Sequence, residues 1–236
     1  MTKTPADSAP AVDAQHYIGH RERLRARFLK GGGDALADYE LLELVLFRAI
    51  PRRDVKPLAK ALLARFGSFA GVVSARPERL REIAGLGEAA IVELKIVAEA
   101  AKRFAKVKVE NRPAMGSFSA VLDYCRTAMA FLDREEFRIL FLDKKNLLIA
   151  DEVQSTGTID HAPVFPREII RRAFELNATA LILIHNHPSG DPSPSQTDIQ
   201  MTRQIVSLGK SLNVAVHDHL IIGRDGFTSF KSLQLI

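Results

Sequence analysis

The stretch Ala180–Asp198, ALILIHNHPSGDPSPSQTD, decides the fold of the second half of the chain. It opens with a short apolar run, which predicts a buried strand. Side chains two positions apart on a strand point the same way, so His185 and His187 project from one face at the strand's end. Pro188 then stops the strand, because proline has no N–H to donate to a ladder. The sequence therefore predicts two imidazoles held side by side, an arrangement suited to a divalent metal.

Ser195 and Asp198 follow this strand after a short loop. A serine with an acidic residue three positions later resembles a capping box, and taken alone the pair needs no other explanation. The loop is short enough to return the helix start toward the two histidines, so that Asp198 can complete a three-ligand set. Two imidazoles and a carboxylate suit Zn²⁺ and leave a fourth coordination position for water.

A zinc hydrolase also needs a proton acceptor, and Glu152 is the candidate that the sequence suggests. It lies on a predicted strand, Leu147–Gln154, that can pair near the histidine strand. A solvent-facing carboxylate without a catalytic role fits the same spacing equally well. Ser195, besides capping the helix, is suited to donate a hydrogen bond to a developing oxyanion.

The spacing His185-x-His187-Pro188, six residues, then Ser195-x-x-Asp198, with Glu152 upstream, resembles the JAMM (MPN) metalloprotease motif. The surrounding sequence resembles the bacterial RadC-like family over nearly the whole chain from about Ile18. This resemblance implies that His185, His187 and Asp198 bind zinc. It further implies that Glu152 is the general acid/base and that Ser195 assists the tetrahedral intermediate. The family's historical label is DNA repair, and amide hydrolysis is implied only by analogy with proteases that cut isopeptide bonds.

Other reactive residues have simpler explanations. His217-Asp218-His219 is a second His-x-His pair inside a predicted strand, and we interpret it as structural or as support that orients a metal-binding group. The single Cys125 excludes an intramolecular disulfide and a cysteine-rich zinc site. We expect this thiol to be a buried small apolar group rather than a nucleophile.

Composition and charge narrow the class of protein. The chain has 236 residues, of which 47% are apolar, and contains no apolar run as long as the roughly 18 residues of a transmembrane helix. The start of the chain lacks the pattern of a signal peptide, so we expect a cytoplasmic protein with no membrane partner.

The charge is unevenly distributed along the chain. Residues 1–112 hold 21 Lys/Arg against 14 Asp/Glu, a net of +7, whereas residues 113–236 hold 12 against 14, a net of −2. The basic half favours a polyanionic partner such as DNA, although a solvated helical surface has the same composition.

The periodicity predicts an α/β chain in which a mixed-sheet domain follows a small all-α domain. The resemblance implies that the mixed-sheet domain is of the JAMM/MPN type, and the all-α domain resembles a helix-hairpin-helix domain. The expected organisation is a disordered tail at 1–17, a helical domain at 18–106, a linker at 107–117 and the α/β domain at 118–236. Helices are expected at 20–29, 38–50, 54–66, 77–83, 88–106, 118–132, 166–177 and 195–212. Strands are expected at 137–142, 147–154, 179–187, 214–222 and 227–230.

The stretch Ile83–Gly87, IAGLG, resembles a helix-hairpin-helix motif. Gly85 and Gly87 permit a tight turn that exposes backbone N–H groups at a helix N-terminus, where phosphate binds favourably. Glu88 opposes this reading because its carboxylate repels phosphate, and an ordinary αα-hairpin remains the alternative. Basic residues further along the same helix would add salt-sensitive phosphate contacts: Lys95, Lys102, Arg103 and Lys106.

These observations predict a zinc-dependent, metallopeptidase-like hydrolase that works in a DNA-associated context. The sequence leaves peptide, isopeptide and nucleic-acid bonds open as substrates, and it leaves the oligomeric state open. The alternative is a non-catalytic DNA-binding accessory protein in which the metal only stabilises the fold.

Overall fold

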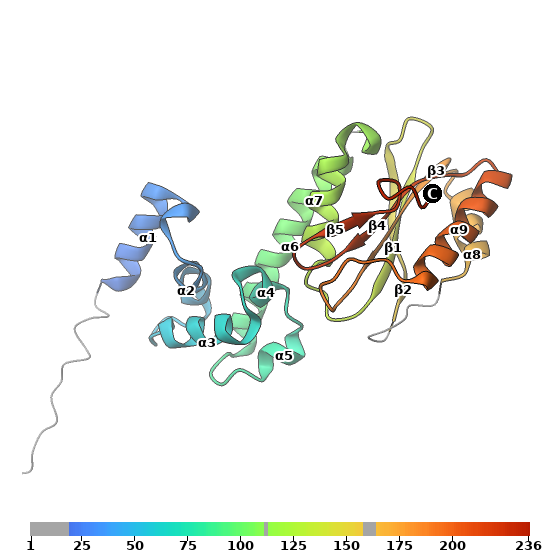
Figure 1. The fold of residues 1–236 in the computed structure, drawn as a ribbon. Coiled ribbons are helices and arrows are strands. Elements are labelled where there is room, and N and C mark those ends of the chain that lie inside the picture. Colours follow the sequence, from blue (N-terminus) through green and yellow to red (C-terminus); the bar gives the residue numbers. More distant parts are fainter. Residues whose placement is uncertain (1–18, 111–112, 158–163) are drawn as a thin grey trace, which may run out of the picture. The chain divides into compact units, whose positions relative to one another are not determined.

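The computed structural model describes residues 19–110, 113–157 and 164–236. The chain forms two compact units, one up to Ile96 and the other from Val97 onward, and each is described by itself (Figure 1). The boundary falls inside one long helix, α6 (Glu88–Glu110). The tail predicted at 1–17 lies outside the described residues.

The first unit is helical, as the sequence predicts. Its core is built from fully buried leucines that recur at helical spacing, among them Leu42, Leu46 and Leu62. Gly32 (φ 67°) ends the first helix, and its N–H donates to the Phe28 carbonyl over 2.8 Å. The helices before α6 are α1 (His20–Gly31), α2 (Asp38–Ala49), α3 (Lys56–Phe66), α4 (Phe69–Ser74) and α5 (Pro77–Arg81), and a short 3-10 turn spans Gly33–Ala35.

Two side chains hold the start of helix α4. Asp38, the first residue of α2, accepts the Phe69 N–H at the start of α4 over 3.0 Å. Helix α4 itself was not predicted, because six residues are too few for a periodic pattern. Ser68 caps α4 by accepting the Gly71 N–H over 3.0 Å.

The expected linker at 107–117 is also different in the structure. Helix α6 continues to Glu110 because its sequence contains no glycine or proline that would end it earlier. Val109 is buried, and it joins the core of the second unit together with Ala114. Residues Ala114–Ser117 form a 3-10 turn, so helical structure occupies most of the described part of this segment.

The second unit is built on a five-stranded mixed sheet with the order β2-β1-β3-β4-β5. Only β3 and β4 pair in parallel, and the other neighbours are antiparallel. The strands are β1 (Glu136–Leu142), β2 (Leu148–Thr156), β3 (Ala180–Asn186), β4 (Ala215–Ile222) and β5 (Phe227–Ser229). The helices are α7 (Phe118–Met129), α8 (Pro166–Glu175) and α9 (Gln196–Ser211).

Helices cover both faces of this sheet. Figure 1 shows α7 on one side of the strands and α8 with α9 on the other. Leu140 and Ile182 face the α7 core, whereas Ile139 and Leu183 face the α8–α9 core, as the alternation of a strand requires. All seven residues of β3 are buried, which explains the apolar run 180–184 at its start. In the described part of the chain, no helix is long and apolar enough to cross a membrane.

Candidate metal centre

The end of β3 holds the two histidines as the sequence predicts. His185 is on the strand with its side chain 3% exposed, and His187 lies just beyond the strand, 17% exposed. The His187 N–H donates to the Ile222 carbonyl over 3.0 Å, which extends the pairing with β4 past the strand end. The two Nε2 atoms lie 2.9 Å apart. Both rings therefore present the same nitrogen to one point.

Asp198 reaches this point from the first turn of α9. One carboxylate oxygen, Oδ1, lies 3.4 Å from His185 Nε2, and the other, Oδ2, lies 3.8 Å from His187 Nε2. The loop between strand and helix thus returns to the histidines as predicted. It packs closely on Gly223: a Cβ there would lie 2.2 Å from the Gly190 carbonyl oxygen, so any larger residue would displace the loop.

Ser195 is the N-cap of α9 and also orients Asp198. Its hydroxyl accepts the Asp198 N–H over 3.1 Å and donates to Asp198 Oδ2 over 2.6 Å. The Ser195 N–H donates to the same Oδ2 over 2.8 Å. This is a complete capping box with aspartate at its third position, and it leaves Oδ1 directed at His185.

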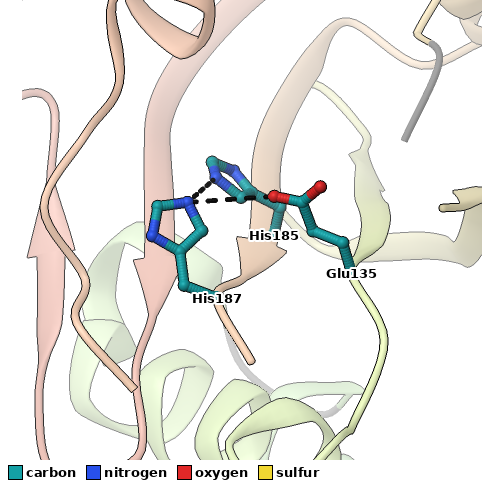
Figure 2. A group of neighbouring side chains, drawn as sticks. All are labelled: Glu135, His185 and His187. Atoms are coloured by element: carbon teal, nitrogen blue, oxygen red, sulfur yellow. Dashed lines mark hydrogen bonds and ion pairs between the residues drawn. The ribbon is translucent and has the colours of Figure 1, made fainter. Parts of the chain in front are cut away.

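Glu135 lies beside the two histidines, and the sequence reasoning did not single it out. Its Oε1 lies 3.9 Å from His187 Nε2, and its side chain points toward the two imidazoles (Figure 2). Ligand atoms of Glu135, His185 and His187 all lie within 4.8 Å of one another. The signal lies in the strand register: Phe137 on β1 pairs with His185 on β3, so the antiparallel pairing carries Glu135 level with His187.

Glu152, the predicted acid/base, lies elsewhere. Its carboxylate accepts hydrogen bonds from the Arg172 guanidinium at 2.6 to 3.2 Å. Those bonds lower its pKa below the ordinary value. Glu152 on β2 pairs with Ile139 on β1, which in turn pairs with Leu183 on β3. Since His185 lies two residues beyond Leu183, the Cα atoms of Glu152 and His185 are about 12 Å apart. Glu152 is thus an ion-pair partner of Arg172 on α8 and does not lie beside the histidines as expected, whereas Glu135 does.

The protonation states of the side chains in this site favour the binding of a cation. Burial lowers the pKa of His185 to about 4, so the ring is neutral at pH 7. His187 Nδ1 lies 2.8 Å from the Asp191 carbonyl oxygen, which can only accept, so in the neutral ring Nε2 carries the lone pair. Two nitrogens and the carboxylates of Asp198 and Glu135 then meet as acceptors. This donor set, two imidazoles with carboxylate, fits Zn²⁺.

The histidines line a cavity of about 510 Å³. Its charged walls are acidic, and among the residues that the structure describes no lysine or arginine lines it. The lining residues are Glu135, Phe137, Val164, His185, His187, Ser195, Thr197, Asp198, Gln200, Met201 and Gln204.

A family model described as the RadC-like JAB domain matches residues 115–235. This chain belongs to the RadC-like family. A second model, described as UPF0758 N-terminal, matches residues 16–92, which covers the described helices α1 to α5. The match places the His-x-His strand and Asp198 inside the RadC-like JAB domain. Glu135, which lies beside the two histidines, is in that domain as well.

Among the described residues of the RadC-like domain, the other reactive groups do not form a second site. His217 contacts the Asn146 side chain over 2.6 Å. Asp218 accepts the Ser229 hydroxyl over 2.6 Å and the backbone N–H groups of His219 and Lys231. Cys125 is fully buried, which raises the pKa of its thiol. His219 differs from these residues because its ring contacts His185.

The residues predicted to bind nucleic acid lie in the helical part of this RadC-like chain, and they differ in how far they are engaged by other protein groups. Gly85 (φ 84°) and Gly87 are exposed at the start of α6. The Lys95 ammonium donates to the carbonyls of Val73 and Ala75 over 2.7 and 2.9 Å, which is a helix-capping role. Arg103 pairs with Glu99 over 2.8 Å, and Lys102 is half-buried. Glu88, which opposes phosphate binding, is paired with Arg81 over 2.6 Å.

Proposed function

We propose that this chain is a zinc-dependent hydrolase of amide bonds. The observation that carries the proposal is the meeting of His185, His187 and Asp198 with a further carboxylate, Glu135, at one cavity. Three ligands and a nearby carboxylate are the parts that a metal-assisted hydrolysis requires.

His185, His187 and Asp198 would hold the metal. A zinc ion supplies Lewis acidity, which favours the ionisation of water and polarises a carbonyl group. Asp198 is held for this task by Ser195, whose backbone and hydroxyl both donate to its Oδ2. The buried ring of His185 is held by β3 and stacks on Phe137 at a centroid distance of 6.2 Å.

Glu135 would be the general base and acid in place of Glu152. Its carboxylate lies on the cavity side of His187, within reach of a water molecule between the two groups. It would take a proton from the attacking water and deliver that proton to the leaving nitrogen. The carbonyl carbon gains the oxygen of water, the C–N bond breaks, and a carboxylic acid and an amine result.

Ser195 would have a second role at the oxyanion. Its hydroxyl proton is committed to Asp198 in the resting arrangement, and the residue lines the cavity. Rotation of that hydroxyl toward the carbonyl oxygen would add a hydrogen bond as negative charge develops there. The capping bond from Asp198 N–H to the serine oxygen is compatible with either direction of the proton.

The cavity wall supports an amide rather than a phosphodiester substrate. Binding a nucleic-acid backbone requires cationic groups, and among the described residues the charged groups that line this cavity are carboxylates. Thr197, Gln200 and Gln204 share one face of α9 and offer neutral donors and acceptors, which match the N–H and C=O groups of a peptide.

The test begins with metal analysis of the purified chain, which should contain about one zinc per chain. Hydrolysis is then measured on a library of internally quenched peptides, with lysine-branched isopeptides as a second arm. Glu135→Gln should retain zinc and lose activity, whereas Glu152→Gln, its matched control, should retain both. A wild-type chain that binds no zinc would overturn the proposal, as would cleavage of quenched oligonucleotides that is abolished by Glu135→Gln.

The alternative function is a non-catalytic accessory protein that binds DNA. The exposed Gly85–Gly87 turn and the basic character of residues 1–112 favour this alternative. The full chain is titrated with duplex DNA at two salt concentrations, using Lys102→Ala/Arg103→Ala as the variant. Salt-sensitive binding that this variant weakens supports a DNA partner. Glu135→Gln should not change that binding, which separates the two functions.

A further inference from the structure

Two polar side chains lie directly behind His185, and neither belongs to the proposed zinc ligands. They are His219 on β4 and Thr202 on α9, and both are 0% exposed. A buried polar group that lacks a partner destabilises the folded state. Their positions in the apolar layer between the sheet and α9 therefore need an explanation in terms of what they bind.

The two residues form a continuous row of hydrogen bonds. His185 Nδ1 lies 2.8 Å from His219 Nε2, and His219 Nδ1 lies 2.6 Å from Thr202 Oγ1. The Thr202 hydroxyl lies 2.6 Å from the backbone carbonyl oxygen of Asp198. The row thus begins at one proposed zinc ligand and ends at another.

The direction of every bond in this row follows from its last member. A carbonyl oxygen only accepts, so Thr202 donates its single proton to Asp198. The threonine oxygen then accepts from His219 Nδ1–H. A neutral imidazole has only one N–H, so His219 Nε2 is an acceptor and must receive Nδ1–H of His185. The remaining nitrogen of His185, Nε2, is left with its lone pair directed at His187 and Asp198.

We propose that Thr202 and His219 are positioning residues that select the tautomer of His185 and thereby present its Nε2 lone pair to a divalent cation. The inference rests on the metal site of the proposed function and adds the residues that control it. Buried groups behind a ligating histidine fix its orientation and raise its basicity. Here the same row also holds the backbone of Asp198, so two ligands share one support.

Packing keeps the His219 ring in the required orientation. Its centroid lies 4.6 Å from that of Phe230 and 5.7 Å from that of Phe137, which meets it edge-on. These two rings restrict rotation about the Cβ–Cγ bond. The backbone N–H of His219 is held by the neighbouring Asp218 carboxylate over 2.7 Å. The ring is therefore fixed by its neighbours, and the hydroxyl of Thr202 decides which nitrogen carries the proton.

His187 achieves the same result by a shorter route. Its Nδ1 donates directly to the Asp191 carbonyl in the loop. His185 is enclosed within the sheet, and its Nδ1 meets the imidazole of His219 instead of a carbonyl. An imidazole can donate or accept at either nitrogen, so it gives a defined tautomer only when a third group fixes it. Thr202 is that group.

The test compares Thr202→Val with Thr202→Ser in the full chain. Valine keeps the branched shape and removes the hydroxyl, whereas serine keeps the hydroxyl and removes a methyl group. The first readout is ¹⁵N NMR of histidine-labelled, metal-free protein at neutral pH. The second is zinc affinity, measured by competition with a chromophoric chelator. Thermal unfolding of each variant shows whether it is folded.

The wild type should show His185 and His219 both protonated at Nδ1. Thr202→Val should show mixed tautomers at both rings and about 10- to 100-fold weaker zinc binding, and Thr202→Ser should restore the wild-type tautomers and affinity. Unchanged tautomers and affinity in Thr202→Val would overturn the proposal. If Thr202→Val does not fold, the wild-type spectrum decides, since Nε2–H at His185 also overturns it. A wild-type chain that binds zinc and shows these tautomers but hydrolyses no substrate would count against the proposed function. It would not count against the roles of Thr202 and His219.

Discussion

The two faces of the sheet carry buried polar networks of opposite character. On the α7 face, the Arg138 guanidinium bonds Asp151 over 2.8 Å and Glu136 over 2.7 Å, and the Tyr124 hydroxyl donates to Asp151. On the α8–α9 face, the nitrogens of His185 and His187 meet each other and the carboxylate of Asp198. Donors and acceptors are matched in the first network. In the second, acceptors face acceptors.

This difference separates a structural network from a binding site. A network whose charges are already paired stabilises one conformation and has nothing to offer a ligand. A network in which lone pairs converge is stable only when a cation or protons join it. Glu135 and Glu136 show the contrast at adjacent positions, since alternation sends one carboxylate to each face.

The largest expected effect is the response of the acceptor-rich network to metal. Zinc should raise the unfolding temperature of the wild-type chain, and a chelator should lower it, because the ion binds only the folded arrangement. The double variant His185→Ala/His187→Ala should lose zinc binding, worth on the order of 10 kcal/mol in proteins. Calorimetry with and without zinc checks this. If zinc raised the unfolding temperature of the double variant as much as that of the wild type, the two histidines would not be the metal site.

The next effect separates Glu135 from its neighbour Glu136. Glu135→Gln should lower the rate of amide hydrolysis by about 10²- to 10⁴-fold because the proton acceptor is lost. Its unfolding temperature and zinc content should stay close to the wild type. Initial rates on a cleaved peptide of the library check this. Glu136→Gln should leave the rate close to that of the wild type, and equal rate losses in both variants would contradict the assignment.

Breaking the network around Arg138 should lower the stability of the fold and leave zinc binding unchanged. Asp151→Ala leaves the Arg138 guanidinium with one carboxylate in a largely buried position and should cost about 3–5 kcal/mol of the free energy of unfolding. Zinc stoichiometry should stay at one. Chemical denaturation and metal analysis of the same sample check both statements. A loss of zinc without a loss of stability would reverse the proposed roles of the two faces.

The smallest effect is expected at Glu152. Its ion pair with Arg172 is partly exposed, so Glu152→Gln should cost only about 0.5 kcal/mol at pH 7. Hydrogen bonds from Arg172 lower the pKa of Glu152, so this stability is present above the ordinary value of 4.5 and is lost as the pH falls through the lowered one. The difference in stability between variant and wild type, measured by denaturation, should be largest at pH 7 and should shrink as the pH is lowered below 4.5.

Local features of the site could be predicted from the sequence, and features that depend on strand register could not. The i, i+2 spacing of His185 and His187 and the capping pattern of Ser195 with Asp198 are set within a few residues, and the structure has both as expected. Choosing between Glu135 and Glu152 requires the pairing of β1 with β2 and β3, which lie far apart in the chain. Periodicity places both glutamates in or beside strands, but it does not say which faces His187.

The same division applies to the fold. Long helices and apolar strands follow from periodicity, and most of their bounds agree within a few residues. Lys95 could not be assigned, because its role depends on where α4 ends in space: its ammonium caps the carbonyls of Val73 and Ala75. Thr202 and His219 also carried no local signal that joins them, since the hydrogen bond between them connects α9 to β4.

Adjacent placement of Glu135 and Glu136 has a consequence for how this chain can vary. Because the two carboxylates occupy adjacent positions at the start of β1, a one-residue slip of that strand against β2 and β3 would turn each of them toward the opposite face. The histidines would lose Glu135, and the same slip would carry Arg138 away from Asp151. A one-residue insertion or deletion within β1 is therefore expected to disrupt both networks together, whereas a change of length in the surface turn before Glu135 should be tolerated.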